Sequence, residues 1–222
     1  MTLTNTPKLE TQTFDCQPRL VLVDTNCFLR LYHSPVRPFL GEIVGGYKLL
    51  TLNTLIQEFH RSKRLQEFYA WLMPDIKAED LSKVAIQTTI GENASIKQER
   101  IDHEGYVQSV ISLHCQKENT SIRSLSGRDL DLLATAIVME AVVATDEWPL
   151  RLVVNDLMSV AGEYEMGLFS SVDMLHLLEV DGKLTPDDRK MTIKSWLRYE
   201  EKLPREWREV YRRLFGEQPP SL

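Results

Sequence analysis

The chain has 222 residues, of which 43% are hydrophobic, and a formal net charge of −6 at pH 7. This is enough for one sizeable core with an appendage, and the negative charge disfavours a general polyanion binder, because phosphate contacts require lysine and arginine. No apolar stretch of about 18 residues occurs, and residues 1–18 are polar, without the plan of a signal peptide. Three cysteines at unrelated spacings predict neither a disulfide framework nor a zinc site. We expect a soluble, cytoplasmic protein that makes no membrane contact.

Four apolar segments predict strands, and each is followed by polar residues. Continuous apolar runs of this kind are typical of strands that are covered on both faces. Between the strands, the periodicity is helical, so the order is strand then helix, repeated. This predicts an α/β, three-layer fold with a parallel, doubly wound sheet of four or five strands. The predicted strands are residues 20–23, 47–52, 150–154 and 166–169.

The remaining segments predict helices and divide the chain into parts. A short helix is expected at 39–44, and Asn53 caps another at 54–62; further helices are expected at 76–90, 95–115, 126–137 and 172–178. Two proline-containing starts near the end predict a helical hairpin whose aromatic face docks on the main domain. The predicted parts are a polar tail at 1–18, an α/β domain at 19–181 with a helical insertion at about 60–125, and a C-terminal helical extension at 182–222.

Four carboxylates stand where predicted strands end or helices begin. Asp24 and Asp156 each close a predicted strand, Glu58 lies beside the apolar stripe of the helix at 54–62, and Asp129 opens the helix after Ser126. Asp129 also fits a capping box with Ser126, which gives it a purely structural explanation. Converging carboxylates repel one another unless a cation lies among them, so the set predicts a site for a hard metal. This interpretation requires Asp24 and Asp156 to share one pocket.

These segments together resemble the PIN domain, a family of metal-dependent nucleases. The resemblance covers most of residues 19–179 and rests on four motifs in order: LVLVDTN at 20–26, TLIQEF at 54–59, SGRDLDLLATA at 126–136 and LVVND at 152–156. It implies that the four acids hold one or two Mg²⁺ or Mn²⁺ ions and that the protein is a hydrolase cutting phosphodiester bonds, usually in RNA. Many relatives carry threonine or serine where Val154 stands, so a helper hydroxyl is missing there.

The resemblance, together with the positions and chemistry of the residues, suggests a role for each of them. Asp24, Asp129 and Asp156 would ligate the metal, with Asp131 as the second choice for the third acid, and Glu58 would position or deprotonate the attacking water. Thr25, Asn26 and Asn155 would support the acids, and Arg61, Lys63 and Arg64 would hold the substrate backbone.

Candidate partners are the RNA substrate, a regulatory protein such as the antitoxin of a toxin–antitoxin pair, and a second copy of the chain. Two alternatives to an endoribonuclease are a catalytically degenerate PIN-like module that binds RNA or protein, and a structure-specific DNA nuclease. The long helical stretch after residue 60 and the hairpin beyond 182 argue against a small toxin-type member.

Overall fold

The structure is a computed structural model that describes residues 17–70, 74, 81–160 and 164–221. The predicted tail at 1–18 therefore lies almost wholly outside the described residues, as does most of 71–80. Among the residues that are described, no helix combines the length and apolar composition needed to cross a bilayer.

A five-stranded sheet forms the centre of the fold, in the order β2-β3-β1-β4-β5. All neighbouring strands are parallel except β2, which pairs antiparallel with β3. The predicted α/β class with a mainly parallel sheet is thus confirmed. The strands are β1 (Arg19–Val23), β2 (Ile43–Val44), β3 (Tyr47–Leu50), β4 (Val142–Ala144) and β5 (Gly167–Phe169).

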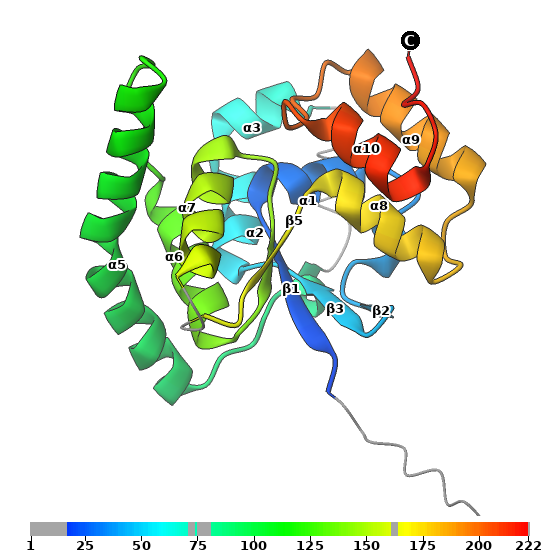
Figure 1. The fold of residues 1–222 in the computed structure, drawn as a ribbon. Coiled ribbons are helices and arrows are strands. Elements are labelled where there is room, and N and C mark those ends of the chain that lie inside the picture. The colour runs from blue at the N-terminus through cyan, green and yellow to red at the C-terminus, as the bar shows by residue number, and fades with distance from the viewer. Residues whose placement is uncertain (1–16, 71–73, 75–80, 161–163, 222) are drawn as a thin grey trace, which may run out of the picture.

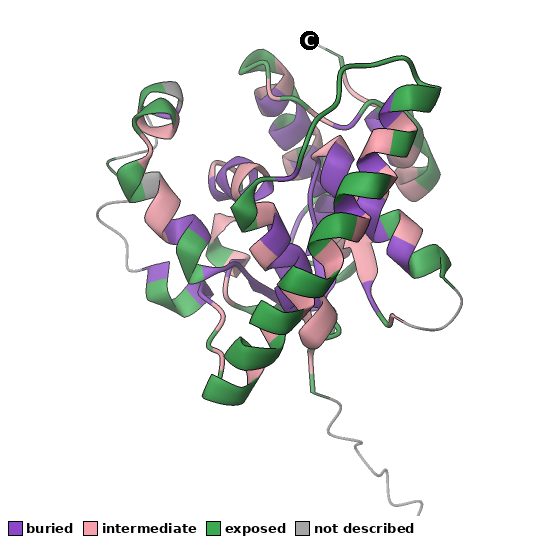
Figure 2. Cartoon of the chain, turned by 90° about the vertical axis from the view of Figure 1, so that its left-hand side faces the viewer, coloured by how far each residue is buried: buried purple, intermediate pink, exposed green. Residues whose placement is uncertain are grey.

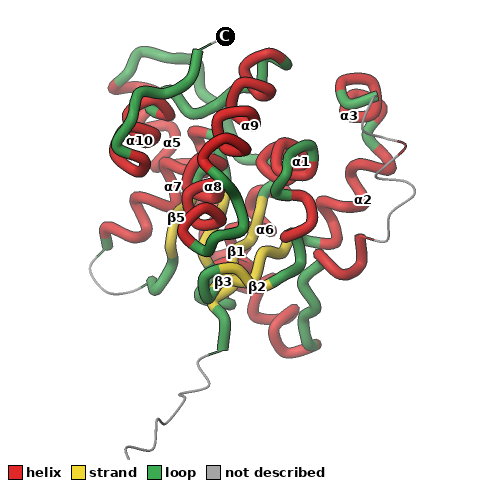
Figure 3. Tube along the Cα trace, turned by 90° about the vertical axis from the view of Figure 1, so that its right-hand side faces the viewer, coloured by secondary structure: helices red, strands yellow, loops and turns green. Residues whose placement is uncertain are grey.

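Helices cover both faces of this sheet (Figure 1). One face carries α5 (Ile90–Lys117), α6 (Gly127–Val138) and α7 (Trp148–Ser159). The other carries α1 (Thr25–Tyr32), α8 (Ser171–Val180), α9 (Pro186–Arg198) and α10 (Trp207–Phe215), and Figure 3 shows α8 and α9 in front of the strands. The remaining elements are α2 (Asn53–Arg61), α3 (Lys63–Phe68) and the 3₁₀ turns η1 (Arg37–Phe39) and η2 (Leu81–Val84).

Alternation along the strands sends side chains into two separate cores. Val21 and Val23 of β1 join the cluster beneath α1 and α8, whereas Leu22 joins the cluster beneath α6 and α7. Successive side chains of a strand point to opposite faces, which explains why an unbroken apolar run is needed here. The outward face of α5 is exposed along most of its length (Figure 2).

The C-terminal helices extend the core on the α8 side. Trp196 of α9 and Trp207 and Tyr211 of α10 are buried in the same cluster as β1 and α8, which confirms that the aromatic face docks. Gly216 ends α10 with a φ of 67°, a left-handed conformation that favours glycine.

Two predicted elements are wrong in type. The predicted helix at 39–44 is instead the end of η1 followed by β2, whose hairpin with β3 turns at Gly45-Gly46. The predicted strand at 150–154 lies inside α7, and the strand next to β1 is β4 at Val142–Ala144. Of the predicted helix at 76–90, residues 76–80 lie outside the described part, 81–84 form η2, and α5 begins at Ile90.

Candidate active site

The candidate site lies at the edge where β1 and β4 end side by side. From β1 the chain moves to β3 on one side and later crosses to β4 on the other, so this is the point where the winding direction reverses. Open α/β sheets bind their ligands in the crevice at such a point. Polar residues follow both strands: Asp24 after β1, and Thr145, Asp146 and Glu147 after β4.

Asp24 is held in place by both strands. Its backbone N–H donates to the carbonyl of Ala144 at 3.0 Å, and its side chain caps α1 by accepting from the Cys27 N–H at 2.6 Å. The hydroxyl of Thr145 donates to the other carboxylate oxygen. Only 3% of Asp24 is exposed, so these bonds fix a buried carboxylate at the sheet edge.

Burial raises the pKa of Asp24 from 3.8 to about 7. Removal from water is the largest cause, and the negative charge of Glu147 adds to it; the bonds from Thr145 and Cys27 and the charge of Arg30 act in the opposite direction. The ionised form of Asp24 therefore lacks sufficient positive charge around it. A cation at this position would supply it.

Glu147 is the second acid at this edge, and it was not among the residues predicted from the sequence. It directly precedes α7, its N–H donates to Thr145 Oγ at 3.0 Å, and its carboxylate accepts a hydrogen bond from the amide of Asn26. Burial raises the pKa of Glu147, and the charges of Asp129 and Glu58 raise it further. The acids therefore act on one another although they come from four separate segments.

Glu58 is brought to the same edge by α2. Thr25 Oγ donates to one of its oxygens at 3.3 Å, and a guanidinium nitrogen of Arg128 lies 2.5 Å from the other. Thr25 and Asn26, predicted as supporting residues, thus bond to Glu58 and Glu147 respectively.

Asp129 and its neighbour Asp131 face different partners. Asp129 closes the predicted capping box, accepting from the Ser126 N–H at 2.9 Å, while its charge still acts on Glu147. Asp131 instead forms an ion pair with Arg100 at 2.7 Å. Of the two, Asp129 is the acid that shares an electrostatic environment with the rest of the site.

Asp156 does not lie where the sequence predicted. It is in α7, eight residues beyond the start of that helix, a rise of about 12 Å, and it accepts a hydrogen bond from Tyr106 of α5. Asn155 beside it is exposed. The expected convergence of Asp24 and Asp156 is therefore wrong, and Glu147 is the acid that meets Asp24 across β1 and β4.

A signal for the correct assignment is present in the sequence. Leu150, Val153, Val154 and Leu157 are the buried residues of α7, and their i, i+3, i+4, i+7 spacing is that of an amphipathic helix, not a strand. Pro149 in the first turn is typical of a helix start. These patterns favour a strand before residue 145 and a helix after 147.

Asp146 lies between Thr145 and Glu147 in the sequence, but its side chain bonds to residues outside the site. It forms a buried ion pair with Arg30 and accepts from the Ser171 N–H at 3.0 Å. The predicted substrate-binding residues Arg61, Lys63 and Arg64 are exposed around the junction of α2 and α3.

The donor chemistry of the site fits a hard divalent cation. Carboxylate oxygens are the ligands that Mg²⁺ prefers, and Mg²⁺ usually keeps several waters and takes only one or two protein carboxylates directly. Asp24 and Glu147 provide those two, and the raised pKa of each is what mutual repulsion and burial produce without a cation. Within the described residues, no three acidic, histidine or cysteine side chains already form a ligand cage.

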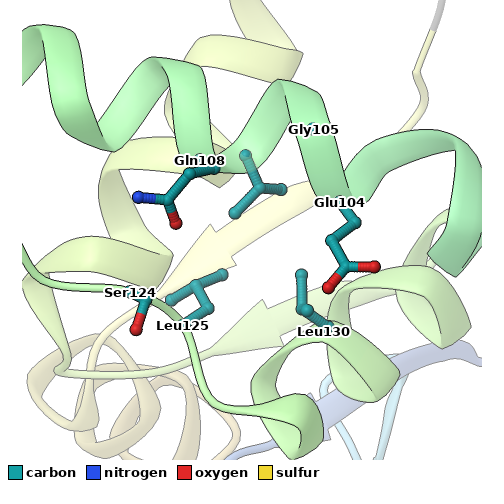
Figure 4. A pocket seen from close by; sticks show the side chains of 7 residues that line it. Glu104, Gly105, Gln108, Ser124, Leu125 and Leu130 are labelled. Atoms are coloured by element: carbon teal, nitrogen blue, oxygen red, sulfur yellow. The ribbon is translucent and has the colours of Figure 1, made fainter.

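A hollow on the α5 side lies away from these acids. It has a volume of about 390 Å³ and lies between α5 and the segment leading into α6, with Glu104, Gln108 and Leu130 among its lining residues (Figure 4). None of the four acids contributes to its lining.

Comparison of the chain with models of protein families, with curated proteins and with solved structures found no match in any of the three.

Proposed function

We propose that this protein is a divalent-metal-dependent endoribonuclease that hydrolyses phosphodiester bonds, as the resemblance to PIN domains implies. The observation that supports this most directly is the meeting of Asp24 and Glu147 at the ends of β1 and β4, with Glu58 and Asp129 in the same electrostatic environment. Capping explains Asp24 at α1 and Asp129 at α6 one at a time, but it does not explain why acids from four separate segments act on one another at the switch point. Such a set of acids is explained if a cation binds among the carboxylates and if the substrate also arrives with a bound cation.

The roles of the side chains follow from their contacts. Asp24 and Glu147 would hold Mg²⁺ or Mn²⁺, which when bound supplies the positive charge that stabilises the anionic transition state. Thr145 orients Asp24, and Asn26 orients Glu147, each through one hydrogen bond. Asp129 adds negative charge at the site and so strengthens cation binding.

Glu58 is the residue assigned to the proton transfer. It is half-buried, and Thr25 fixes one of its oxygens while the other faces Arg128. A carboxylate placed beside the metal-holding acids accepts a proton from the attacking water, and a general base typically accelerates such a step by about 10² to 10⁴-fold.

A second candidate function is supported by the same hydrogen bonds. Asp24, Glu147 and Glu58 each accept a bond from a neighbouring side chain of the protein, an arrangement that also suits a module that binds RNA or protein without cutting. A DNA nuclease is the third candidate. The three differ in what they bind and in whether metal is required.

The test is incubation of the purified chain with labelled single-stranded RNA and with DNA, in Mg²⁺, in Mn²⁺ and in chelator, beside the Asp24→Asn variant. Cleavage of RNA that requires metal and is abolished in Asp24→Asn supports the proposal. Binding without cleavage favours the module, and cleavage of DNA alone favours the DNA nuclease. Equal cleavage by wild type and Asp24→Asn would exclude this site.

A further inference from the structure

Arg128 extends from the first turn of α6 to the rim of the acidic site. Its guanidinium pairs with Glu58, which lies 70 positions earlier in α2, yet 45% of the Arg128 side chain is exposed against 18% for Glu58. One side of the guanidinium therefore meets the acids while the rest remains open to solvent. This is the position from which a cation can contact both the site and a bound polyanion.

A second arginine near the start of α6 has a different partner. Arg100 of α5 pairs with Asp131, and one of its guanidinium nitrogens lies 3.2 Å from where a side chain on Gly127 would begin. Asp131 is not one of the four acids of the site, so Arg100 ties α5 to α6, whereas Arg128 is paired with a site acid.

The net charge makes such local cations necessary. At −6 overall, and with four carboxylates at the site, the protein repels a phosphodiester chain unless positive side chains stand beside the acids. The planar guanidinium fork matches two phosphate oxygens at once, which lysine does not.

We propose that Arg128 holds the phosphodiester backbone of a single-stranded RNA next to the acids. In this assignment, Arg128 exchanges its contact with Glu58 for a phosphate, which leaves that carboxylate oxygen without its cation when substrate is bound. The assignment rests on the proposed function for the identity of the substrate. It differs from the sequence-based prediction, which gave this role to Arg61, Lys63 and Arg64.

The experiment measures binding without cleavage. The full chain carrying Asp24→Asn is titrated in chelator against a fluorescent single-stranded oligoribonucleotide, and anisotropy gives the affinity at several NaCl concentrations. Adding Arg128→Ala should weaken binding about 5- to 10-fold at low salt, and it should reduce the slope of log affinity against log[NaCl] by about 0.7, the value for one phosphate contact on a single strand. Arg128→Lys should recover only part of the loss.

The matched control is Arg213→Ala. Arg213 is also exposed, but it lies on α10, which packs against α8 on the opposite face of the sheet. Its removal changes the net charge by the same amount and should leave both the affinity and the slope unchanged. Equal losses for Arg128→Ala and Arg213→Ala, or no measurable binding by the Asp24→Asn chain, would overturn the assignment.

A further variant separates a direct contact from an indirect effect. Glu58→Gln releases Arg128 from its ion pair, so RNA affinity should rise, and this gain should disappear when Arg128→Ala is added. A gain of the same size in both backgrounds would overturn the exchange. Binding that depends on Arg128, without any cleavage by the wild type, would leave the assignment standing and refute the nuclease. Cleavage by the wild type with binding that is insensitive to Arg128→Ala would refute the assignment alone.

Discussion

Replacing Asp24 by asparagine should stabilise the metal-free protein at pH 8, although it removes the central acid of the site. The cause is the pKa of Asp24, which is about 7 in the folded chain against an ordinary value of 3.8. A carboxyl whose pKa is raised by folding binds its proton more tightly in the folded state. The free energy of unfolding therefore falls as pH rises from 3.8 to about 7, and the full penalty applies above that.

The size of the effect follows from the same shift. Three pKa units correspond to about 4 kcal/mol, of which about 2–3 kcal/mol develops between pH 5 and pH 8. Asparagine removes the charge, but it can accept only one of the two bonds that Cys27 and Thr145 donate to Asp24, a loss of about 1 kcal/mol. The variant should thus be about 3 kcal/mol more stable than wild type at pH 8 and within about 1 kcal/mol of it at pH 5.

The assay is chemical unfolding of both proteins in chelator at pH 5 and pH 8. Asp102→Asn, the same change on the exposed face of α5, is the control and should alter stability by less than about 0.5 kcal/mol. Added Mn²⁺ at pH 8 should raise the unfolding midpoint of wild type more than that of Asp24→Asn. A stability difference that is the same at both pH values would refute the reasoning, because it would mean that Asp24 does not carry the burial penalty assigned to it.

Three other substitutions test neighbouring parts of the site. Glu147→Gln should reduce the rate of metal-dependent cleavage by about 100-fold or more, whereas Asp156→Asn should leave that rate within about twofold of wild type. If a rate assay gave the reverse order, Asp156, as predicted from the sequence, would be the site acid instead of Glu147. Thr145→Val removes the hydroxyl that lowers the pKa of Asp24. When the free energy of unfolding is measured against pH, its decline should therefore extend to higher pH than in wild type. An unchanged profile would argue against that hydrogen bond. Asp146→Asn should lower the free energy of unfolding by about 3 kcal/mol, because it leaves the buried charge of Arg30 poorly compensated, and adding Arg30→Met should recover part of this loss. A loss below about 1 kcal/mol for the single variant in chemical unfolding would contradict this.

Features set by local sequence were predictable. The apolar run ending at Asp24 predicted β1, and the serine and threonine caps of α6 and α9 are present with their reciprocal carboxylates. Each depends on residues within three or four positions of one another. Local hydrogen bonds of this kind can be inferred from spacing alone.

The composition of the site was harder to predict because its contacts span the chain. The bonds from Asn26 to Glu147 and from Thr145 to Asp24 join residues 121 positions apart, and Arg128 reaches Glu58 across 70. β4, the strand that precedes Glu147, has only three residues, too few to show an alternating pattern. The longer apolar segment at 150–154 is easily taken for the strand instead, and only its helical spacing shows that it is part of a helix.

The C-terminal extension is connected to the candidate site by one buried arginine. Arg30 of α1 pairs with Asp146 at the end of β4 and also contacts Glu201 at 3.4 Å and the carbonyl of Lys202 at 3.2 Å, beyond α9. Trp196 of α9 in turn donates to the Arg30 carbonyl at 3.2 Å.

Arg151 makes a parallel connection, from the Thr145 carbonyl at 3.1 Å to Glu206 before α10 at 3.0 Å. Thr145 and Asp146 directly precede Glu147 in the segment between β4 and α7. Holding these two residues in place therefore also holds Glu147 where its charge acts on Asp24. The bonds from Arg30 to Glu201 and Lys202 are half-buried, and the bond from Arg151 to Glu206 is exposed. Because all of them would lose their partners if residues 182–222 moved, the extension supports the geometry of the acids as well as covering apolar surface.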